Sequence, residues 1–374
     1  MASSFSLPRR PARDRRRGAL LALLLAFACV PSTAPAPGVD AAPAAIQAAV
    51  LAPFDAARLT RSQSPVRVEA NRFVNEAGAT VIFQGVNIED PDDLERNGHW
   101  NRGLFEAIAA WNANVVRVPV HPPRFRRRGA QQYFELLDQA VLWANELDLY
   151  LILDWHSIGN LLKHRFQEGQ YDTSEPETVQ FWRSAASRYQ KVPTVALYEL
   201  FNEPTFGPKG RLGSTSWPDW KRFNEQLIDV IREHNPSAVA LVAGFDWAYD
   251  LRPVAEAPIE RPGVAYVAHP YPGKTRPPYA PKWDESFGFV AERYPLIATE
   301  IGYMPPDARG AHVPAIDTGN YGGEITYYLG RKGASWVAWC FSPSWTPTLI
   351  SDWSYTANDA GSHFRGVMKT RPAR

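Results

Sequence analysis

Cysteine and charge are both scarce in this sequence. The 374 residues include only two cysteines, and 21% of the residues are charged. If the N-terminal leader that contains Cys29 is removed, Cys340 has no partner for an intramolecular disulfide, so a hydrophobic core must hold the fold. Hydrophobic residues make up 45% of the chain, which excludes intrinsic disorder and a small disulfide-stapled scaffold.

The apolar run at the N-terminus, Ala19–Val30, is too short to span a bilayer. Six arginines between Arg9 and Arg17 precede it. A basic stretch followed by a short apolar one is typical of a secretory signal, so we predict that residues 1–30 are a signal peptide and that the protein is secreted. An ordinary buried helix is the alternative, and Arg9–Arg10 leaves a twin-arginine signal open.

Two cleavage positions fit the sequence, one after Ala28 and one after Ala36. The first leaves Cys29 at the new N-terminus, where a lipid anchor is a minor alternative, as is periplasmic retention. Residues 1–30 carry six arginines and one aspartate, so their loss lowers the formal net charge from +1 to −4. The mildly acidic net charge of the remaining chain argues against nucleic acid or an anionic membrane as a partner. We expect the protein to be a monomer.

Composition divides the rest of the chain in two. Residues 31–62 are rich in Ala and Pro, and we interpret them as a linker, either a tether or a packed leader segment. Residues 63–374 form the predicted catalytic domain. It opens with a β-hairpin, in which Val66–Val68 and Arg72–Val74 flank polar residues and Asn75–Gly78 turns the chain into the first barrel strand.

Short apolar runs then alternate with longer segments of helical period. The runs are Val81–Val86, Val115–Val118, Leu149–Leu153, Val195–Leu200, Ala238–Ala243, Val264–Ala268, Leu296–Ala298 and Ser335–Ala338. Continuous apolar runs suit strands buried on both faces, and eight of them separated by helices predict an α/β fold, a (β/α)8 TIM barrel. The alternative, an open doubly wound sheet, lacks a Gly-rich phosphate turn after its first strand.

Polar and aromatic residues follow the predicted strands. They are Arg117, Asp154-Trp155-His156, Asn202-Glu203-Pro204, His269-Pro270-Tyr271, Glu300 and Trp339. In a barrel of parallel strands these ends point to one face, where active sites form. Residues far apart in the sequence, such as Glu203 and Glu300, therefore converge on one cleft.

The two carboxylates indicate cleavage of a glycosidic bond. That reaction needs one carboxylic acid to protonate the leaving oxygen and a second carboxylate to attack the anomeric carbon or to activate water. A carboxylate beside a cation such as Arg117 stays ionised, while its partner can hold a proton near neutral pH. We therefore interpret Glu203 and Glu300 as a catalytic pair.

The segment Leu197-Tyr198-Glu199-Leu200-Phe201-Asn202-Glu203-Pro204 resembles the Asn-Glu-Pro signature of glycoside hydrolase family 5, the cellulase and mannanase family of clan A. The resemblance spans about residues 66–345 and keeps the family's order through Arg117, Leu153–His156, His269–Tyr271, Thr299–Gly302 and Trp336–Trp339. It implies a retaining glycosidase with Glu203 as acid/base and Glu300 as nucleophile. Asn202 is then expected to hydrogen-bond the sugar 2-hydroxyl.

The same resemblance implies substrate-binding or positioning roles for the other matched residues. Arg117 and Tyr271 are expected to hold Glu300, and His269 to lie near Glu203. His156 is expected to contact sugar hydroxyls, and Trp339 to stack on the sugar ring at the cleavage point. Taken singly, each of these residues could instead serve packing or a structural ion pair.

Metal and cofactor chemistry finds no support in the sequence. No two histidines share the close spacing of metal ligands, so we predict no metal site and no cofactor. Of the tryptophans, Trp111, Trp143, Trp182 and Trp220 fall on predicted helices and are expected to pack in the core. Trp155 fits either the core or the cleft.

Two segments depart from the family pattern. Asn87-Ile88-Glu89-Asp90, after the first strand, is more acidic than the loop usual there, and Cys340–Trp345 contains an aromatic pair that we assign to no subsite. These departures leave the substrate open. We predict an endo-β-1,4-glucanase acting on polysaccharide, with a β-mannanase, another β-1,4-hemicellulase, a transglycosylase or a non-catalytic carbohydrate-binding barrel as alternatives.

Overall fold

The computed structural model describes residues 51–205 and 212–370. The predicted signal peptide, both cleavage positions, Cys29 and residues 31–50 of the predicted linker lie outside these residues. None of the helices in the described part of the chain is long and apolar enough to cross a membrane.

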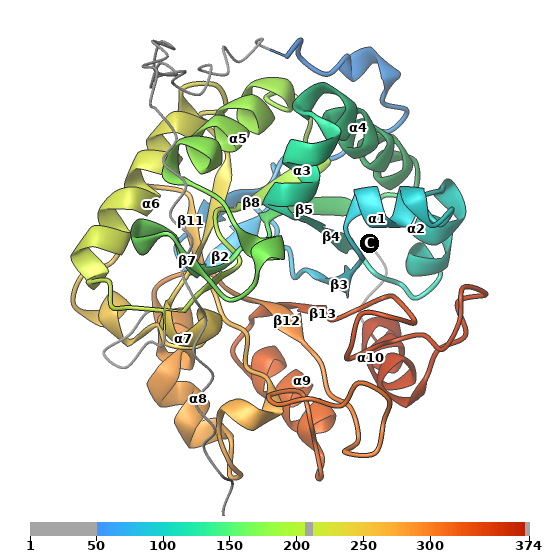
Figure 1. Cartoon of the computed structure of the whole chain (residues 1–374), viewed down its shortest axis with the longest axis vertical. Helices are drawn as coiled ribbons and strands as arrows, with labels where there is room; N and C mark the ends of the chain where they lie inside the picture. Colours follow the sequence, from blue (N-terminus) through green and yellow to red (C-terminus); the bar gives the residue numbers. More distant parts are fainter. Residues whose placement is uncertain (1–50, 206–211, 371–374) are drawn as a thin grey trace, which may run out of the picture. The chain divides into compact units, whose positions relative to one another are not determined.

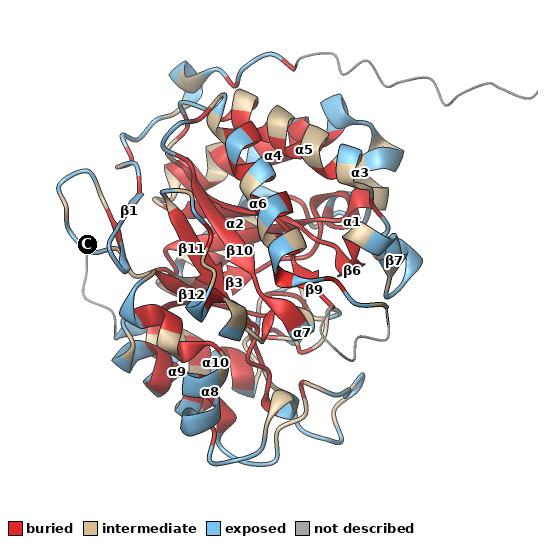
Figure 2. Ribbon diagram, turned by 90° about the vertical axis from the view of Figure 1, so that its left-hand side faces the viewer, coloured by how far each residue is buried: buried red, intermediate tan, exposed pale blue. Residues whose placement is uncertain are grey.

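Eight parallel strands close into a barrel, which confirms the predicted fold (Figure 1). In chain order they are β3 (Gln84–Asn87), β4 (Val115–Val120), β5 (Tyr150–Trp155), β8 (Val195–Glu199), β10 (Val239–Ala243), β11 (Val264–Val267), β12 (Leu296–Ile301) and β13 (Ser335–Ala338). Every barrel strand after β3 is buried along its whole length, as the apolar runs predicted (Figure 2).

Helices surround the barrel and pack their apolar faces on it (Figure 1). They are α1 (Pro91–Arg96), α2 (Arg102–Ala109), α3 (Pro122–Arg128), α4 (Ala130–Glu146), α5 (Glu175–Arg188), α6 (Trp217–Arg232), α7 (Phe245–Ala248), α8 (Ala280–Ser286), α9 (Tyr321–Arg331) and α10 (Asp359–Lys369). Ser174 and Ser216 cap the N-termini of α5 and α6 through their side chains. Between β11 and β12 the chain forms α8 followed by the 3-10 helix Gly288–Glu292, and Gly288, a poor helix former, lies at the break.

The predicted hairpin is present as β1 (Arg67–Glu69) and β2 (Arg72–Val74), which pair antiparallel. The first barrel strand begins at Gln84 rather than at Val81, because Val81 still bonds Phe73 of the hairpin through its backbone N–H (2.8 Å). Phe73 packs edge-on against Phe83 at 5.3 Å, in a hydrophobic cluster with barrel residues such as Ile152. The hairpin thus covers barrel residues with its apolar side.

The described part of the predicted linker belongs to the packed domain. Phe54 is buried, and its N–H donates to the carbonyl of Arg188 at 2.9 Å. Arg188 in turn donates to the carbonyl of Ala52, and Asn145 accepts from the backbone of Thr60. Residues 51–62 are therefore a packed leader segment, one of the two interpretations of this region, and not a tether.

A small sheet extends beyond the barrel at the carboxyl ends of its strands (Figure 2). It contains β6 (Ile158–Asn160), β7 (Arg165–Phe166) and β9 (Glu203–Pro204), with Ile158 opposite Glu203. A Cβ at Gly159 would lie 2.6 Å from the carbonyl oxygen of Arg165, so only glycine fits between these strands. This sheet fixes the backbone of Glu203.

Candidate active site

Glu203 and Glu300 lie together at the carboxyl ends of the barrel strands. Glu203 sits in β9 just after β8, and Glu300 is part of β12. Both are buried, with 8% and 5% of their surfaces exposed. One oxygen of each carboxylate lies within 4.8 Å of the other. This separation resembles the roughly 5–5.5 Å of retaining glycosidases rather than the 6.5–9.5 Å of inverting ones.

Both oxygens of Glu300 accept a hydrogen bond. Arg117 donates to Oε1 at 3.0 Å, and the Tyr271 hydroxyl donates to Oε2 at 2.8 Å. Burial raises the pKa of Glu300 even though His269 and Arg117 act in the opposite direction. Arg117 was expected to keep this carboxylate ionised, and it does favour the charged form, but burial is the larger influence on the pKa. Burial also raises the pKa of Tyr271, which keeps the hydroxyl protonated as a donor.

Arg117 connects the residues of the site from the barrel interior. It is fully buried and donates to both oxygens of Glu199 at 2.7 and 2.8 Å. It also donates to Asn87 and to Asn202, at 2.9 and 2.7 Å, besides Glu300. Burial disfavours its charge, but the surrounding carboxylates raise its pKa, so Arg117 is a permanent cation.

His269 joins Glu203 to the barrel interior. Its Nδ1 lies 2.9 Å from Oε1 of Glu203, and its Nε2 lies 2.9 Å from the hydroxyl of Thr299. That hydroxyl donates its proton to Glu199 at 2.9 Å, so it must accept from Nε2–H. Burial alone would lower the pKa of His269, but the nearby carboxylates of Glu300, Glu199 and Glu203 raise it to about 9. The ring is therefore an imidazolium that donates Nδ1–H to Glu203.

Asn202 has an orientation that its neighbours define. Its Oδ1 accepts from Arg117, which can only donate, so the other terminal atom is the amide nitrogen. This Nδ2 is buried and has no hydrogen-bond partner among the described residues. An unpaired buried donor is costly, and ligand hydroxyls are natural partners for it.

His156 and Trp339 form one wall of the site. Their rings stack with centroids 5.5 Å apart and planes within 12°. Nδ1 of His156 lies 2.6 Å from Oδ2 of Asp154, and burial lowers the pKa of His156, so the ring is neutral. Trp339 is anchored by its Nε1–H, which donates to the carbonyl of Thr346 at 3.2 Å.

The structure brings all eight predicted site residues into one connected cluster. They are Arg117, His156, Asn202, Glu203, His269, Tyr271, Glu300 and Trp339. Sequence reasoning missed Asn87, Glu199 and Thr299, which orient Arg117 and His269. The signal for Glu199 was present, because it is a charged residue inside the apolar run of β8.

The four tryptophans that were predicted on helices pack in the core, although Trp111 lies in the turn just after α2. Trp111, Trp182 and Trp220 are buried, and Trp143 is half-buried against the same core cluster. Trp155, which the sequence left open, is fully buried and stacks on Phe181 at 4.3 Å. It belongs to the core and not to the cleft.

One cluster of side chains could not be predicted from sequence spacing, because its members lie far apart along the chain. Glu203, His269 and Glu300 offer three potential metal-ligand atoms within 4.8 Å of one another, although no spacing in the chain suggested it. Each nitrogen of His269 is already engaged in a hydrogen bond. The hydrogen bonds of this cluster are therefore those of side chains that share a proton.

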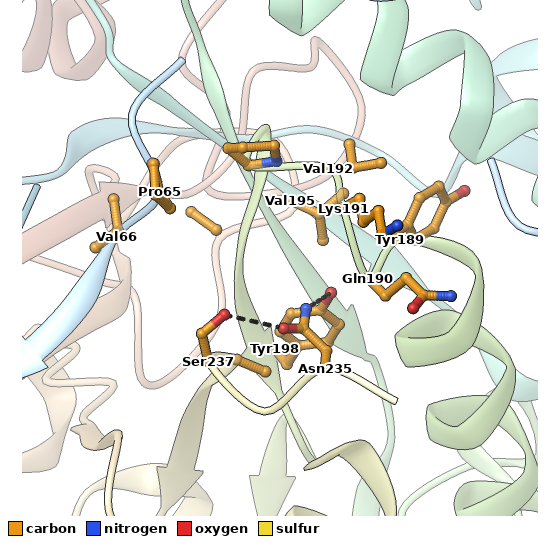
Figure 3. Close-up of a pocket in the computed structure, with 13 residues that line it drawn as sticks. Pro65, Val66, Tyr189, Gln190, Lys191, Val192, Val195, Tyr198, Asn235 and Ser237 are labelled. Atoms are coloured by element: carbon orange, nitrogen blue, oxygen red, sulfur yellow. Dashed lines mark hydrogen bonds between the residues drawn. The ribbon is translucent and has the colours of Figure 1, made fainter. Parts of the chain in front are cut away.

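Two further pockets lie away from these carboxylates. One, of about 130 Å³, is lined by residues such as Val195, Tyr198 and Asn235 at the amino ends of the barrel strands (Figure 3). There Asn235 donates to the Tyr198 hydroxyl at 3.2 Å. The other, of about 410 Å³, is polar and lies beside the N-terminus of α6. Neither contains the catalytic candidates, and the amino-terminal face of such barrels serves stability.

Comparison with known proteins connects this geometry to a family. Residues 74–344 match the family model described as cellulase, glycosyl hydrolase family 5. The endoglucanase of Paenibacillus polymyxa is 24% identical over 338 residues, 76% of this chain and 82% of that protein. Endoglucanase A of Butyrivibrio fibrisolvens is 24% identical over 253 residues, 65% of this chain. The match spans only 53% of the length of that protein.

Solved structures agree. A β-glucanase from Saccharophagus degradans is 47% identical, with a TM-score of 0.83 over 85% of this chain and 96% of that one. The same β-glucanase has been solved in complex with cellotetraose. The catalytic domain of Thermobifida fusca endoglucanase Cel5A, at 19% identity and a TM-score of 0.67, supports the fold alone.

Proposed function

Because the chain belongs to glycosyl hydrolase family 5, we propose that it is a retaining endo-β-1,4-glucanase that hydrolyses cellulose-like glucans. The observation that carries this proposal is the pair of buried carboxylates, Glu203 and Glu300, with oxygens within 4.8 Å. This gap admits an anomeric carbon but leaves no room for a water between the second carboxylate and the sugar. That geometry favours double displacement with retention.

In the first step Glu300 attacks the anomeric carbon, and the bond to the leaving oxygen breaks as Glu203 protonates that oxygen. A water then attacks the glycosyl–Glu300 ester, gives its proton to Glu203 and releases the Glu300 carboxylate. Arg117 and Tyr271 hold Glu300 in place during both steps. Its raised pKa makes Glu300 more basic than an exposed carboxylate and therefore a better nucleophile.

His269 supplies the proton that Glu203 needs. In the free enzyme the imidazolium donates to Glu203 through Nδ1–H at 2.9 Å. A bound sugar excludes water, and a dry site favours the neutral pair over the ion pair, so the proton moves to Glu203. Glu203 passes it to the leaving oxygen, and the pair is reset when Glu203 takes the proton of the attacking water.

Asn202, His156 and Trp339 hold the sugar at the cleavage point. The unpaired Nδ2 of Asn202 donates to the 2-hydroxyl, an interaction that strengthens as the oxocarbenium-like state develops. Trp339, with 8% of its surface exposed, offers an aromatic plane to the apolar face of the ring. His156 contacts a hydroxyl at its edge.

The β-glucanase relative solved with cellotetraose supports a β-glucan as the substrate. A β-mannanase or another β-1,4-hemicellulase remains the second candidate, because one barrel serves many glycans through its loops. A transglycosylase differs only in the acceptor of the second step. A non-catalytic carbohydrate-binding barrel would need no catalytic pair, and both carboxylates are present.

Reducing-sugar release from carboxymethylcellulose, mannan and xyloglucan tests the substrate class. NMR of the first product formed distinguishes a retained β-anomer from an inverted one. We expect Glu300→Ala to abolish turnover without unfolding the protein, and Glu203→Gln to slow the first step least on aryl glycosides with good leaving groups, because acid assistance matters less there. An active Glu300→Ala variant, or an inverted product, would refute the assignment.

The proposal also includes secretion of the protein and its oligomeric state. The arginine-rich N-terminus with its short apolar run supports secretion, since a polymeric substrate is met outside the cell. The expected monomer stays a prediction that light scattering of the purified protein can check.

A further inference from the structure

The two segments that depart from the family pattern contact each other. The hydroxyls of Ser342 and Ser344, in the loop after β13, both donate to Oε1 of Glu89, in the segment after β3. Oγ of Ser342 accepts in turn from the backbone N–H groups of Ser344 and Trp345, at 2.9 and 3.0 Å. Glu89 therefore fixes the turn that carries Trp345.

Glu89 faces the mouth of the barrel. Side chains alternate along an extended chain: Asn87 bonds Arg117 inside the barrel, Ile88 packs in the outer core, and Glu89 returns to the side of Asn87. Only 2% of Glu89 is exposed. Yet its Oε2 has no hydrogen-bond partner, and no Lys or Arg pairs with the carboxylate, in residues 51–205 and 212–370. Oε2 is not one of the fully buried side-chain atoms that lack a partner, so it keeps some contact with solvent, and a ligand hydroxyl can donate to it there.

His121 provides a second acceptor nearby. Both oxygens of Asp90 accept backbone N–H groups, from Asp92 and from His121, each at 2.8 Å. Nδ1 of His121 lies 3.1 Å from the same carboxylate and donates to it. Burial outweighs Asp90 and lowers the pKa of His121, so the ring is neutral. Its Nε2 keeps a lone pair that no described residue uses.

An aromatic platform adjoins these acceptors. The ring of Trp345 lies 5.8 Å from that of Trp339, with planes within 24°, and 5.3 Å from that of His121. His121 lies 4.6 Å from His156, which itself stacks on Trp339. The wall that begins at the cleavage point therefore continues through His121 and Trp345.

We propose that Glu89, His121 and Trp345 form a sugar subsite beside the one over Trp339, an inference that rests on the proposed glucanase function. Trp345 takes the apolar face of a glucosyl ring, while Oε2 of Glu89 and Nε2 of His121 accept hydrogen bonds from its hydroxyls. Because Oε2 of Glu89 and Nε2 of His121 can only accept hydrogen bonds, the subsite selects a sugar whose hydroxyl groups are unsubstituted. An ether at either hydroxyl removes the donor and leaves an acceptor unpaired that the bound sugar itself cuts off from water.

Glu89→Gln tests the subsite with an isosteric change. The amide oxygen still accepts from the two serines, but a donor replaces Oε2. We expect about a tenfold loss in kcat/KM for cellotetraose, the size expected for one lost hydrogen bond to a charged group. Calorimetry on a Glu300→Gln background should show the same loss in affinity. Activity on O-methylated glucan should fall less than on unsubstituted glucan, because the new amide can donate to an ether oxygen.

Glu256→Gln, which changes an exposed carboxylate, is the matched control and should match wild type on both substrates. A folded Glu89→Gln variant with wild-type affinity and an unchanged substrate ratio would overturn the subsite. If that variant does not fold, Trp345→Ala decides: KM for cellotetraose should rise several-fold with kcat little changed, and an unchanged KM overturns the subsite. Wild-type protein that neither binds nor cleaves any β-glucan would overturn the proposed function instead.

Discussion

The imidazolium of His269 should make the protein less stable as the pH rises above neutrality. Its pKa is about 9 in the folded protein, against an ordinary value of 6.5. Each pKa unit corresponds to about 1.4 kcal/mol, so protonation of this buried ring stabilises the fold by about 3 kcal/mol, as an order of magnitude. A raised pKa contributes fully below pH 6.5, and the contribution is lost as the pH rises through 9.

His269→Gln removes the titration while it retains a hydrogen-bonding side chain of similar reach. Urea unfolding of both proteins between pH 6 and 10 gives the free energy of unfolding at each pH. The wild-type advantage should shrink by about 3 kcal/mol between pH 6.5 and 9, whereas costs from packing should not depend on pH. A difference that stays constant over this range would refute the charged ring and, with it, the proton supply to Glu203.

Three further changes test other parts of the site and fold. Tyr271→Phe removes the donor to Oε2 of Glu300, so kcat/KM should fall roughly 10- to 100-fold and the acid limb of the pH–rate profile should move to higher pH; unchanged kinetics would contradict the assignment. Gly159→Ala forces β6 away from Arg165, so thermal unfolding should show a loss of about 1–3 kcal/mol and activity should drop as Glu203 shifts. Phe54→Ala should cost about 3 kcal/mol in urea unfolding yet leave kcat unchanged, and no loss of stability would restore the tether interpretation of residues 51–62.

The barrel was predictable because its physical cause is local. Parallel strands covered by helices are buried on both faces, so each appears as an apolar run, and Leu149–Leu153 or Ala238–Ala243 illustrate this. The carboxyl ends of such strands meet at one face, which is why Glu203 and Glu300 could be paired from their positions alone. Strand ends were less accurate, since Val81 lies in an apolar run typical of a barrel strand but bonds Phe73 of the hairpin.

Features that depend on tertiary contacts could not be predicted from the sequence. Strands of two or three residues, such as β6, β7 and β9, have no periodicity to detect, so the sheet that holds Glu203 was not foreseen. The hydrogen bonds that Arg117 donates to Glu199 and Ser342 donates to Glu89 join residues 82 and 253 positions apart. Only the closed barrel brings these groups together, and the same closure sets the tautomer of His121 and the protonation of His269.

The charge balance at the mouth of the barrel explains why so polar a layer persists in a buried place. In the cluster around Arg117 and His269, the carboxyl groups in contact with these two basic groups are those of Asp154, Glu199, Glu203 and Glu300. Fully ionised, the cluster would carry two net negative charges away from water, and burial accordingly raises the pKa of both Asp154 and Glu300. Glycoside cleavage passes through an oxocarbenium-like state, in which positive charge develops on the sugar beside these carboxylates. The excess negative charge that destabilises the empty site therefore stabilises the transition state, because the groups are already oriented and no water screens them. Apolar side chains of equal volume would make a more stable barrel and would abolish catalysis.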